Sequence, residues 1–276
     1  MTKNLKSAQW LLENLSNVTV LDAGIVKPGE QGAYSPDGVI PGALRFDIST
    51  ALSDDNSTLP NMMCSKNVFQ AEMRQLGINS SDTVIVYDDK GLFSAARAWW
   101  MFKSMGFDQV YVLDGGLKHW RALGYKLVSE YALVEHVGNF TATPRDNYFI
   151  DKECVLKSIK CPETLLLDAR GSKRFKGVGS EPREGMRSGH IPNSSNLPYT
   201  SVLTDEGVLK PLTELKELLK GAGVSESITT LQFSCGSGIT ACILALVAFE
   251  CGYTSLQVYD GSWSEWGQLA DYPVSV

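Results

Sequence analysis

The sequence has few of the residues that bind metals or anionic polymers. It contains only three histidines, and none stands at a metal-ligand spacing, so no metal site is expected. The formal net charge is −6, which provides no basic field for nucleic acid or anionic membranes. No apolar run reaches the roughly 18–20 residues needed to span a bilayer. These absences favour a protein without metal, nucleic-acid or membrane partners.

The six cysteines include no CxxC pair, and in a chain of 276 residues they need not form disulfides. A reducing cytoplasm is therefore the expected location. The N-terminus lacks a basic start followed by a long apolar segment, so it is interpreted as a first helix and not a targeting peptide. With 43% hydrophobic and 20% charged residues, the composition is typical of a globular protein large enough for two cores.

The chain repeats itself at a long spacing. Asp22 in VLDA returns as Asp168 in LLDA, and the same offset relates LDGG to YDGS nearer the end of each copy. A period of this length indicates two duplicated domains and not a solenoid of short units. Segment 137–147 is rich in breaker residues, so the predicted domains are residues 1–140 and 141–276.

Within each copy, short β-branched runs alternate with longer Ala- and Leu-rich runs. This order predicts an α/β fold, with a mainly parallel sheet and helices on both faces of each domain. In the second copy the predicted strands are 164–168, the region around 196–197, 228–234 and 255–259, and the main helices are 211–221 and 241–251. Ligands of such sheets bind beyond the carboxyl ends of the strands.

Cys235 stands at such a strand end. The buried run before it is followed by a turn with two glycines, Gly236 and Gly238, and then by a long apolar helix. Backbone N–H groups of the turn and the positive helix end would form an anion cradle, which favours a thiolate nucleophile. The alternative is a buried cysteine acting as a small hydrophobe, which fits Cys242 and Cys251.

The first copy lacks this thiol. Aligning Gly91 with Gly238 places Asp88 opposite Cys235, and a carboxylate cannot carry sulfur. The first domain is therefore predicted to be catalytically silent and to close one side of the active site. The alternative, an acid/base pair of Asp88 and Asp89, is weaker because acidic residues at a loop-to-helix junction usually complement the helix dipole.

Together these motifs resemble the rhodanese superfamily. The shared features are the tandem domains, the CGSGIT loop in the second copy only, HIP before a strand, and DGSWSEW near the C-terminus. The resemblance implies a sulfurtransferase without a cofactor, in which a small-molecule donor leaves a sulfane sulfur on Cys235 as a persulfide. The acceptor would be a thiol, a thioredoxin-like protein or cyanide. The motifs are closest to tandem enzymes that take sulfur from 3-mercaptopyruvate and release pyruvate.

The loop also bears on the donor. A neutral loop suits a monocarboxylate, and the planar fork of arginine suits its carboxylate. The resemblance assigns this role to Arg174 and Arg183, with Arg170 and Arg187 as substitutes, while surface ion pairs are the ordinary alternative for arginines. The remaining residues expected to contact the substrate are Gly236, Gly238, Ile239 and Thr240.

Ser237 is predicted to be catalytic, as a hydrogen-bond donor to the substrate carbonyl or a proton relay to the pyruvate enolate; its alternative role is a helix-capping hydroxyl. The resemblance implies a Ser-His-Asp relay whose histidine would stand at Val39. Its absence favours direct protonation by the thiol, a water or Ser237.

Three alternative functions compete with this prediction. Phosphatase-like members of the superfamily's fold use a Cys-x5-Arg loop, but the corresponding position here is Ala241, so phosphoryl chemistry is disfavoured. Inactive domains of this kind serve as binding modules, and retention of Cys235 argues against that role. Thiosulfate is the alternative sulfur donor, because Lys176 or Arg187 would supply a cation.

Overall fold

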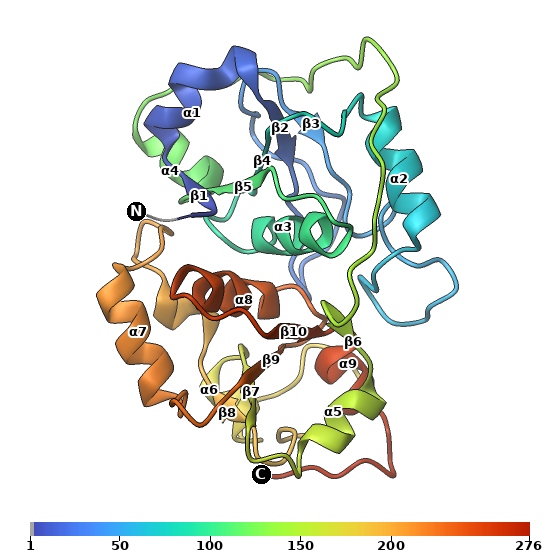
Figure 1. Ribbon diagram of the computed structural model, residues 1–276, viewed down its shortest axis with the longest axis vertical. Coiled ribbons are helices and arrows are strands. Elements are labelled where there is room, and N and C mark those ends of the chain that lie inside the picture. Colours follow the sequence, from blue (N-terminus) through green and yellow to red (C-terminus); the bar gives the residue numbers. More distant parts are fainter. Residues whose placement is uncertain (1–2) are drawn as a thin grey trace.

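A computed structural model describes residues 3–276 and contains two five-stranded sheets (Figure 1). The first sheet has the order β1-β5-β4-β2-β3 and the second the order β6-β10-β9-β7-β8, with every pairing parallel. The strands are β1 (Leu5–Lys6), β2 (Thr19–Asp22), β3 (Leu44–Arg45), β4 (Val84–Tyr87), β5 (Val110–Leu113), β6 (Phe149–Ile150), β7 (Thr164–Asp168), β8 (Ser195–Asn196), β9 (Thr230–Ser234) and β10 (Leu256–Tyr259). The predicted α/β fold with tandem parallel sheets is confirmed.

Helices cover both faces of each sheet. They are α1 (Ala8–Asn14), α2 (Lys66–Gln75), α3 (Ala95–Ser104), α4 (Gly116–Ala122), α5 (Lys152–Ser158), α6 (Ser172–Phe175), α7 (Leu212–Gly221), α8 (Ala241–Glu250) and α9 (Ser262–Trp266). In β4, Val84 and Val86 point to the core that holds α2 and α3, whereas Ile85 and Tyr87 point to the core under α1 and α4. This period-2 alternation places one helical layer on each face.

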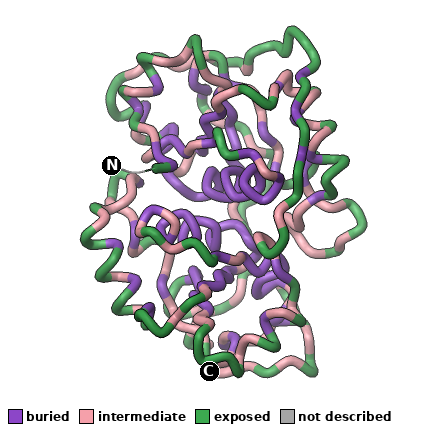
Figure 2. The backbone as a smooth tube through the Cα atoms, viewed as in Figure 1, coloured by how far each residue is buried: buried purple, intermediate pink, exposed green. Residues whose placement is uncertain are grey.

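The two domains meet through α3 and α8, which lie next to each other between the sheets (Figures 1 and 2). Every residue of α3 is buried, and α8 is buried along almost its whole length. The helix α8 is apolar on nearly every side and must be covered all round, and α3 buries even Arg97 and Lys103. Here each helix packs against its own sheet and against the other domain's helix.

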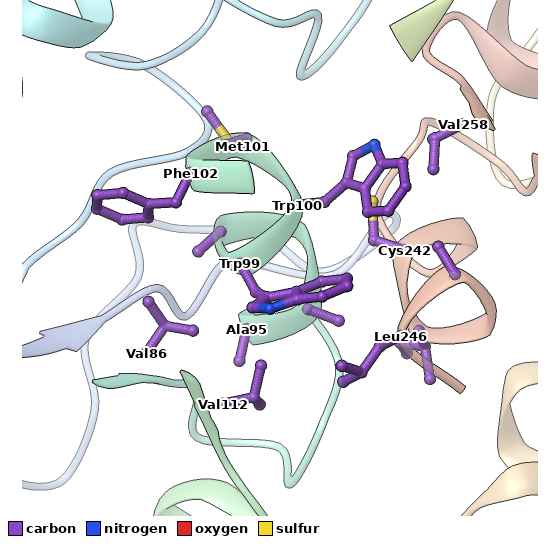
Figure 3. Packing of buried hydrophobic residues seen from close by; sticks show 14 of the residues in the cluster. Val86, Ala95, Trp99, Trp100, Met101, Phe102, Val112, Cys242, Leu246 and Val258 are labelled. Carbon is purple, nitrogen blue, oxygen red and sulfur yellow. The ribbon is translucent and has the colours of Figure 1, made fainter. Parts of the chain in front are cut away.

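The packing at this contact is aromatic and aliphatic. Trp99 and Trp100 of α3 lie beside Cys242 and Leu246 of α8 (Figure 3). The largest hydrophobic cluster passes through this contact from one domain into the other. Within the described residues, α3 and α8 thus merge the facing halves of the two domains into one core, while the outer faces have clusters of their own.

Candidate active site

Cys235 follows directly after β9 and is 2% exposed. The loop 235–240 then leads into α8, as the sequence predicts. β9 is the central strand of an all-parallel sheet. Because the loop follows β9, it lies at the carboxyl ends of the strands, where such folds place ligands.

The DGSWSEW segment, residues 260–266, holds this loop in place by hydrogen bonds. The Ser262 hydroxyl oxygen accepts hydrogen bonds from the N–H groups of Cys235 and Gly238, both at 3.1 Å. The N–H of Trp263 donates to the Cys235 carbonyl at 3.0 Å, and that of Ser264 donates to the Gly236 carbonyl at 2.8 Å. Sequence reasoning missed Ser262 and Ser264, although the small polar residues within the motif were a signal.

These contacts revise the predicted cradle. Two of its N–H groups, those of Cys235 and Gly238, point to Ser262 and not to a ligand. Within residues 3–276, four other loop N–H groups have no hydrogen-bond partner and remain available to an anion. They belong to Gly236, Ser237, Ile239 and Thr240.

Gly238 does not line the cleft beside Cys235. Its φ is +72°, and a Cβ there would lie 2.7 Å from the carbonyl oxygen of Asp260 and 3.0 Å from Nη1 of Arg97. Only glycine satisfies both the left-handed backbone and this close approach. Gly238 therefore shapes the buried side of the loop, and its contact with substrate stays a prediction.

Arg174 and Arg183 both reach the loop. A Cβ built on Gly236 would lie 3.4 Å from Nη2 of Arg174 and 4.0 Å from Nη1 of Arg183, so the two guanidinium groups hang over the residue next to Cys235. Nε and Nη2 of Arg174 both donate to Oε2 of Glu181, which fixes the orientation of the guanidinium group and leaves Nη1 without a partner among residues 3–276. Burial lowers the pKa of Arg183, neighbouring Arg174 lowers it further, and Cys235 opposes the shift.

The two substitute arginines are already occupied. Arg170 is 2% exposed and binds Asp168 through Nε and Nη2 and Glu181 through Nη1. Arg187 donates to the backbone carbonyls of Trp266, Gly267 and Tyr272. Both guanidinium groups are thus held by internal acceptors, although Arg170 lines the cleft and Arg187 does not.

A cleft of about 520 Å³ opens over the loop between the two domains. The second domain supplies Arg174, Arg183 and every residue of the loop 235–240 except Gly238. The first domain supplies Ile25, Val26, Lys27, Pro28, Pro60, Asn61 and Phe93. The cleft is thus completed by a domain whose equivalent loop has no cysteine, which agrees with the expectation that the first domain closes one side.

Val39 stands where the resemblance places a histidine, and it lies outside the cleft. Val39 is 2% exposed, forms a bridge with Val128 and belongs to the core under α1 and α4, outside the cleft lining. The first-domain residue that reaches Ser237 is Asn61, whose Nδ2 donates to Oγ of Ser237 at 3.3 Å.

The first-domain loop holds Asp88 where the second holds Cys235. Asp22 pairs with Tyr87 and Asp168 pairs with Ser234, so Asp88 and Cys235 each follow the corresponding strand residue. The Asp88 carboxylate accepts from four N–H groups, those of Lys90, Phe93, Ser94 and Ala95, at 2.7–2.9 Å. Burial raises its pKa, and these four donors oppose the shift.

Comparison with known proteins agrees with this architecture. Residues 7–123 and 151–269 each match the Rhodanese-like domain, so the chain belongs to the rhodanese family. The 3-mercaptopyruvate sulfurtransferase of Escherichia coli (strain K12) is 39% identical over 273 residues, which cover 97% of this chain and 96% of that protein. The thiosulfate sulfurtransferase of Rattus norvegicus is 36% identical over 277 residues, which cover 96% and 92%.

A solved structure is equally similar. The crystal structure of SseA from Escherichia coli, described as a 3-mercaptopyruvate sulfotransferase with the rhodanese fold, matches with a TM-score of 0.85 and 36% identity. The match covers 96% of this chain and all of that chain. Among residues 3–276, no helix has the length and apolar character to cross a bilayer. That same part of the chain has no group of three or more His, Cys, Asp or Glu side chains that could hold a metal ion.

Proposed function

We propose that this protein is a 3-mercaptopyruvate sulfurtransferase that carries the transferred sulfur as a persulfide on Cys235. The observation that carries the proposal is the pair of guanidinium groups over Gly236, beside a cysteine in an otherwise neutral loop. Arg174 and Arg183 bind the carboxylate and ketone oxygens of the donor, because arginine presents several donors in one plane. The donor's C3–S bond then lies over Cys235.

In the first half-reaction the Cys235 thiolate attacks the donor sulfur. An S–S bond forms as the C3–S bond breaks, and the electron pair of that bond moves to C3 to give the pyruvate enolate. The proton first carried by the donor's sulfhydryl group ends on C3. The products are pyruvate and the Cys235 persulfide anion, which the free N–H groups of Gly236, Ile239 and Thr240 stabilise.

In the second half-reaction an acceptor attacks the outer sulfur. A thiolate, from a small thiol or a thioredoxin-like protein, leaves as a persulfide, and cyanide leaves as thiocyanate. Either acceptor returns Cys235 as a thiolate. Ser237 donates a hydrogen bond to the donor's carbonyl oxygen, which carries the enolate charge while the C3–S bond breaks.

Thiosulfate is the second candidate donor. Lys176 is not among the residues lining the cleft, and Arg187 is bound internally, so the cations first considered for it are not at the site. Lys27 of the first domain does line the cleft, together with Arg170, Arg174 and Arg183 of the second. A dianion would therefore also find cations, although none lies within the loop itself.

Two further assignments complete the proposal. Residues 1–140 form a catalytically silent domain and residues 141–276 the catalytic one, supported by the four N–H donors that the Asp88 carboxylate occupies. The enzyme works in the cytoplasm, supported by six cysteines that are all free thiols within the described chain.

The deciding experiment compares both donors with cyanide as acceptor. We expect kcat/KM for 3-mercaptopyruvate to exceed that for thiosulfate, because the arginine pair fits a keto carboxylate. Mass spectrometry after incubation with 3-mercaptopyruvate should show the mass of one added sulfur on the peptide containing Cys235. A preference for thiosulfate would transfer the assignment to the second candidate.

A further inference from the structure

The first domain holds a turn directly over the catalytic loop. Within the first domain, the Asn61 carbonyl of this turn, residues 60–63, accepts from Nη2 of Arg97 in α3 at 2.7 Å. Across the domain boundary, the Met63 N–H donates to Oδ2 of Asp260 at 2.7 Å. Nη1 of the same Arg97, which is fully buried, donates to Oδ1 of Asp260 at 2.6 Å and to the Gly238 carbonyl at 3.3 Å. The turn and the catalytic loop are therefore both bound to the buried Arg97, and Asp260 of the second domain binds both this arginine and the turn.

This anchoring places the Asn61 side chain between two hydroxyl groups. Its Oδ1 accepts from Oγ of Ser49 at 3.3 Å, and its Nδ2 donates to Oγ of Ser237 at 3.3 Å. With the amide placed in this way, its oxygen faces Ser49 and its nitrogen faces Ser237. An amide nitrogen only donates, so Ser237 is the acceptor in this contact.

The direction of that bond determines what Ser237 does. With one lone pair of its oxygen taken by Asn61, the hydroxyl proton has no acceptor among residues 3–276. Ser237 is 4% exposed and lines the cleft beside Cys235. The proton is therefore available to an oxygen of the substrate.

We propose that Asn61, on the catalytically silent domain, is a positioning residue that holds Ser237 as a hydrogen-bond donor toward the substrate. The proposal rests on the function proposed above and adds a role for the first domain beyond closing the cleft. Asn61 is neutral and has no proton to exchange at physiological pH, so it orients Ser237 and does not relay protons.

The first test replaces Asn61 by Gly. Asn61 has φ +60°, a left-handed conformation that glycine tolerates, and the backbone carbonyl bound by Arg97 is kept. We expect kcat with 3-mercaptopyruvate to fall about 3- to 10-fold, as for loss of one neutral hydrogen bond. KM should stay nearly constant, because the arginines that bind the carboxylate are untouched. An unchanged kcat would overturn the proposal.

The matched control is Asn56→Gly. Asn56 is exposed, lies in the same long loop, and bonds only to Asp54. It should leave kcat unchanged, which separates loss of the Ser237 contact from general loosening of the loop. An equal loss of kcat in Asn56→Gly and Asn61→Gly would overturn the positioning role.

Asn61→Asp tests the proposal through the pH dependence of kcat, which would not change if Asn61 had only a structural role. An ionised carboxylate accepts from Ser237 and so reverses the hydrogen bond, whereas the protonated acid can donate again. The ratio of kcat in Asn61→Asp to kcat in the wild type should therefore rise as pH falls from 8 to 5. A ratio independent of pH would contradict the proposal.

A double-mutant cycle with Ser237→Ala completes the test. In the Ser237→Ala background, Asn61→Gly should have almost no further effect, since the group that it positions is gone. Additive losses would show that Asn61 acts by another route. Persulfide formation on Cys235 is measured in every protein: its absence in the wild type would refute the proposed function itself, while its presence with no response to Asn61 changes refutes only the positioning role.

Discussion

The Cys235 loop and the Asp88 loop occupy equivalent places in the two domains, yet only one is open to a ligand. In the second domain, four loop N–H groups remain unpaired within the described chain, and a cleft of about 520 Å³ lies over them. In the first, the Asp88 carboxylate occupies four N–H groups. The same strand-loop-helix unit therefore leaves its N–H groups open to an external anion in one domain and fills them with its own carboxylate in the other.

The segments that lie over the two loops are also arranged alike. The Met63 N–H of the first domain donates to Asp260 of the second, and the Leu209 N–H of the second donates to Asp114 of the first at 2.9 Å. Each domain thus extends a turn over the other's loop. At the silent loop the approach is closed, because a Cβ on Gly91 would lie 3.1 Å from the Cα of Gly207.

The largest effect is expected from Cys235→Ser. A hydroxyl near pH 7 is neither ionised nor able to hold a sulfane sulfur, so this change should abolish transfer and leave both loops without a sulfur carrier. Mass spectrometry after incubation with the donor gives the measurement. A sulfur adduct that persists in this variant would contradict the assignment, and Cys161→Ser, which changes an exposed cysteine outside the cleft, is the control.

Removing residues 1–140 should be almost as damaging. The deletion uncovers α8 where α3 packs against it, and exposed apolar surface costs roughly 25 cal/mol per Å². It also removes the first-domain wall of the cleft. We expect residues 141–276 alone to be poorly soluble and inactive, as measured by circular dichroism and sulfur transfer. A folded, fully active fragment would refute the structural role of the first domain.

Arg183→Ala should reduce kcat/KM for 3-mercaptopyruvate by about 10- to 150-fold, the loss of a charge-assisted hydrogen bond worth ~1.5–3 kcal/mol. Arg174→Ala should cost a similar amount and also remove one partner of Glu181. The losses should be smaller with thiosulfate. Steady-state kinetics with both donors gives the measurement, and wild-type values in both variants would place the carboxylate site elsewhere.

The smallest effect on catalysis is expected from Asp88→Asn. An amide has one acceptor oxygen in place of two, so at least one of the four N–H donors would lose its partner, which lowers stability by about 1–3 kcal/mol. Persulfide formation on Cys235 should remain complete. Thermal unfolding and mass spectrometry measure the two quantities. Loss of the persulfide in a folded variant would show that the first loop has a part in the chemistry.

The fold was largely predictable because hydrophobic periodicity and the long repeat are local signals. The predicted strand 164–168 matches β7, and the predicted helices 211–221 and 241–251 match α7 and α8 to within one residue at each end. The two-residue strands were harder. Leu5–Lys6 lies inside the segment interpreted as the first helix, because two residues carry no period and their pairing with β5 is made far away in sequence.

The sequence by itself determined that this chain has two related α/β domains, a single loop with a cysteine at a strand end, and two arginines close together in one segment. Only the tertiary structure decided which side chains meet: that Arg170 and Arg187 are bound internally, that Gly238 faces Asp260, and that Asn61 reaches Ser237. The physical reason is that helix and strand patterns depend on neighbours along the chain, whereas Asn61 and Ser237 stand 176 positions apart and meet only because α3 and α8 pack together.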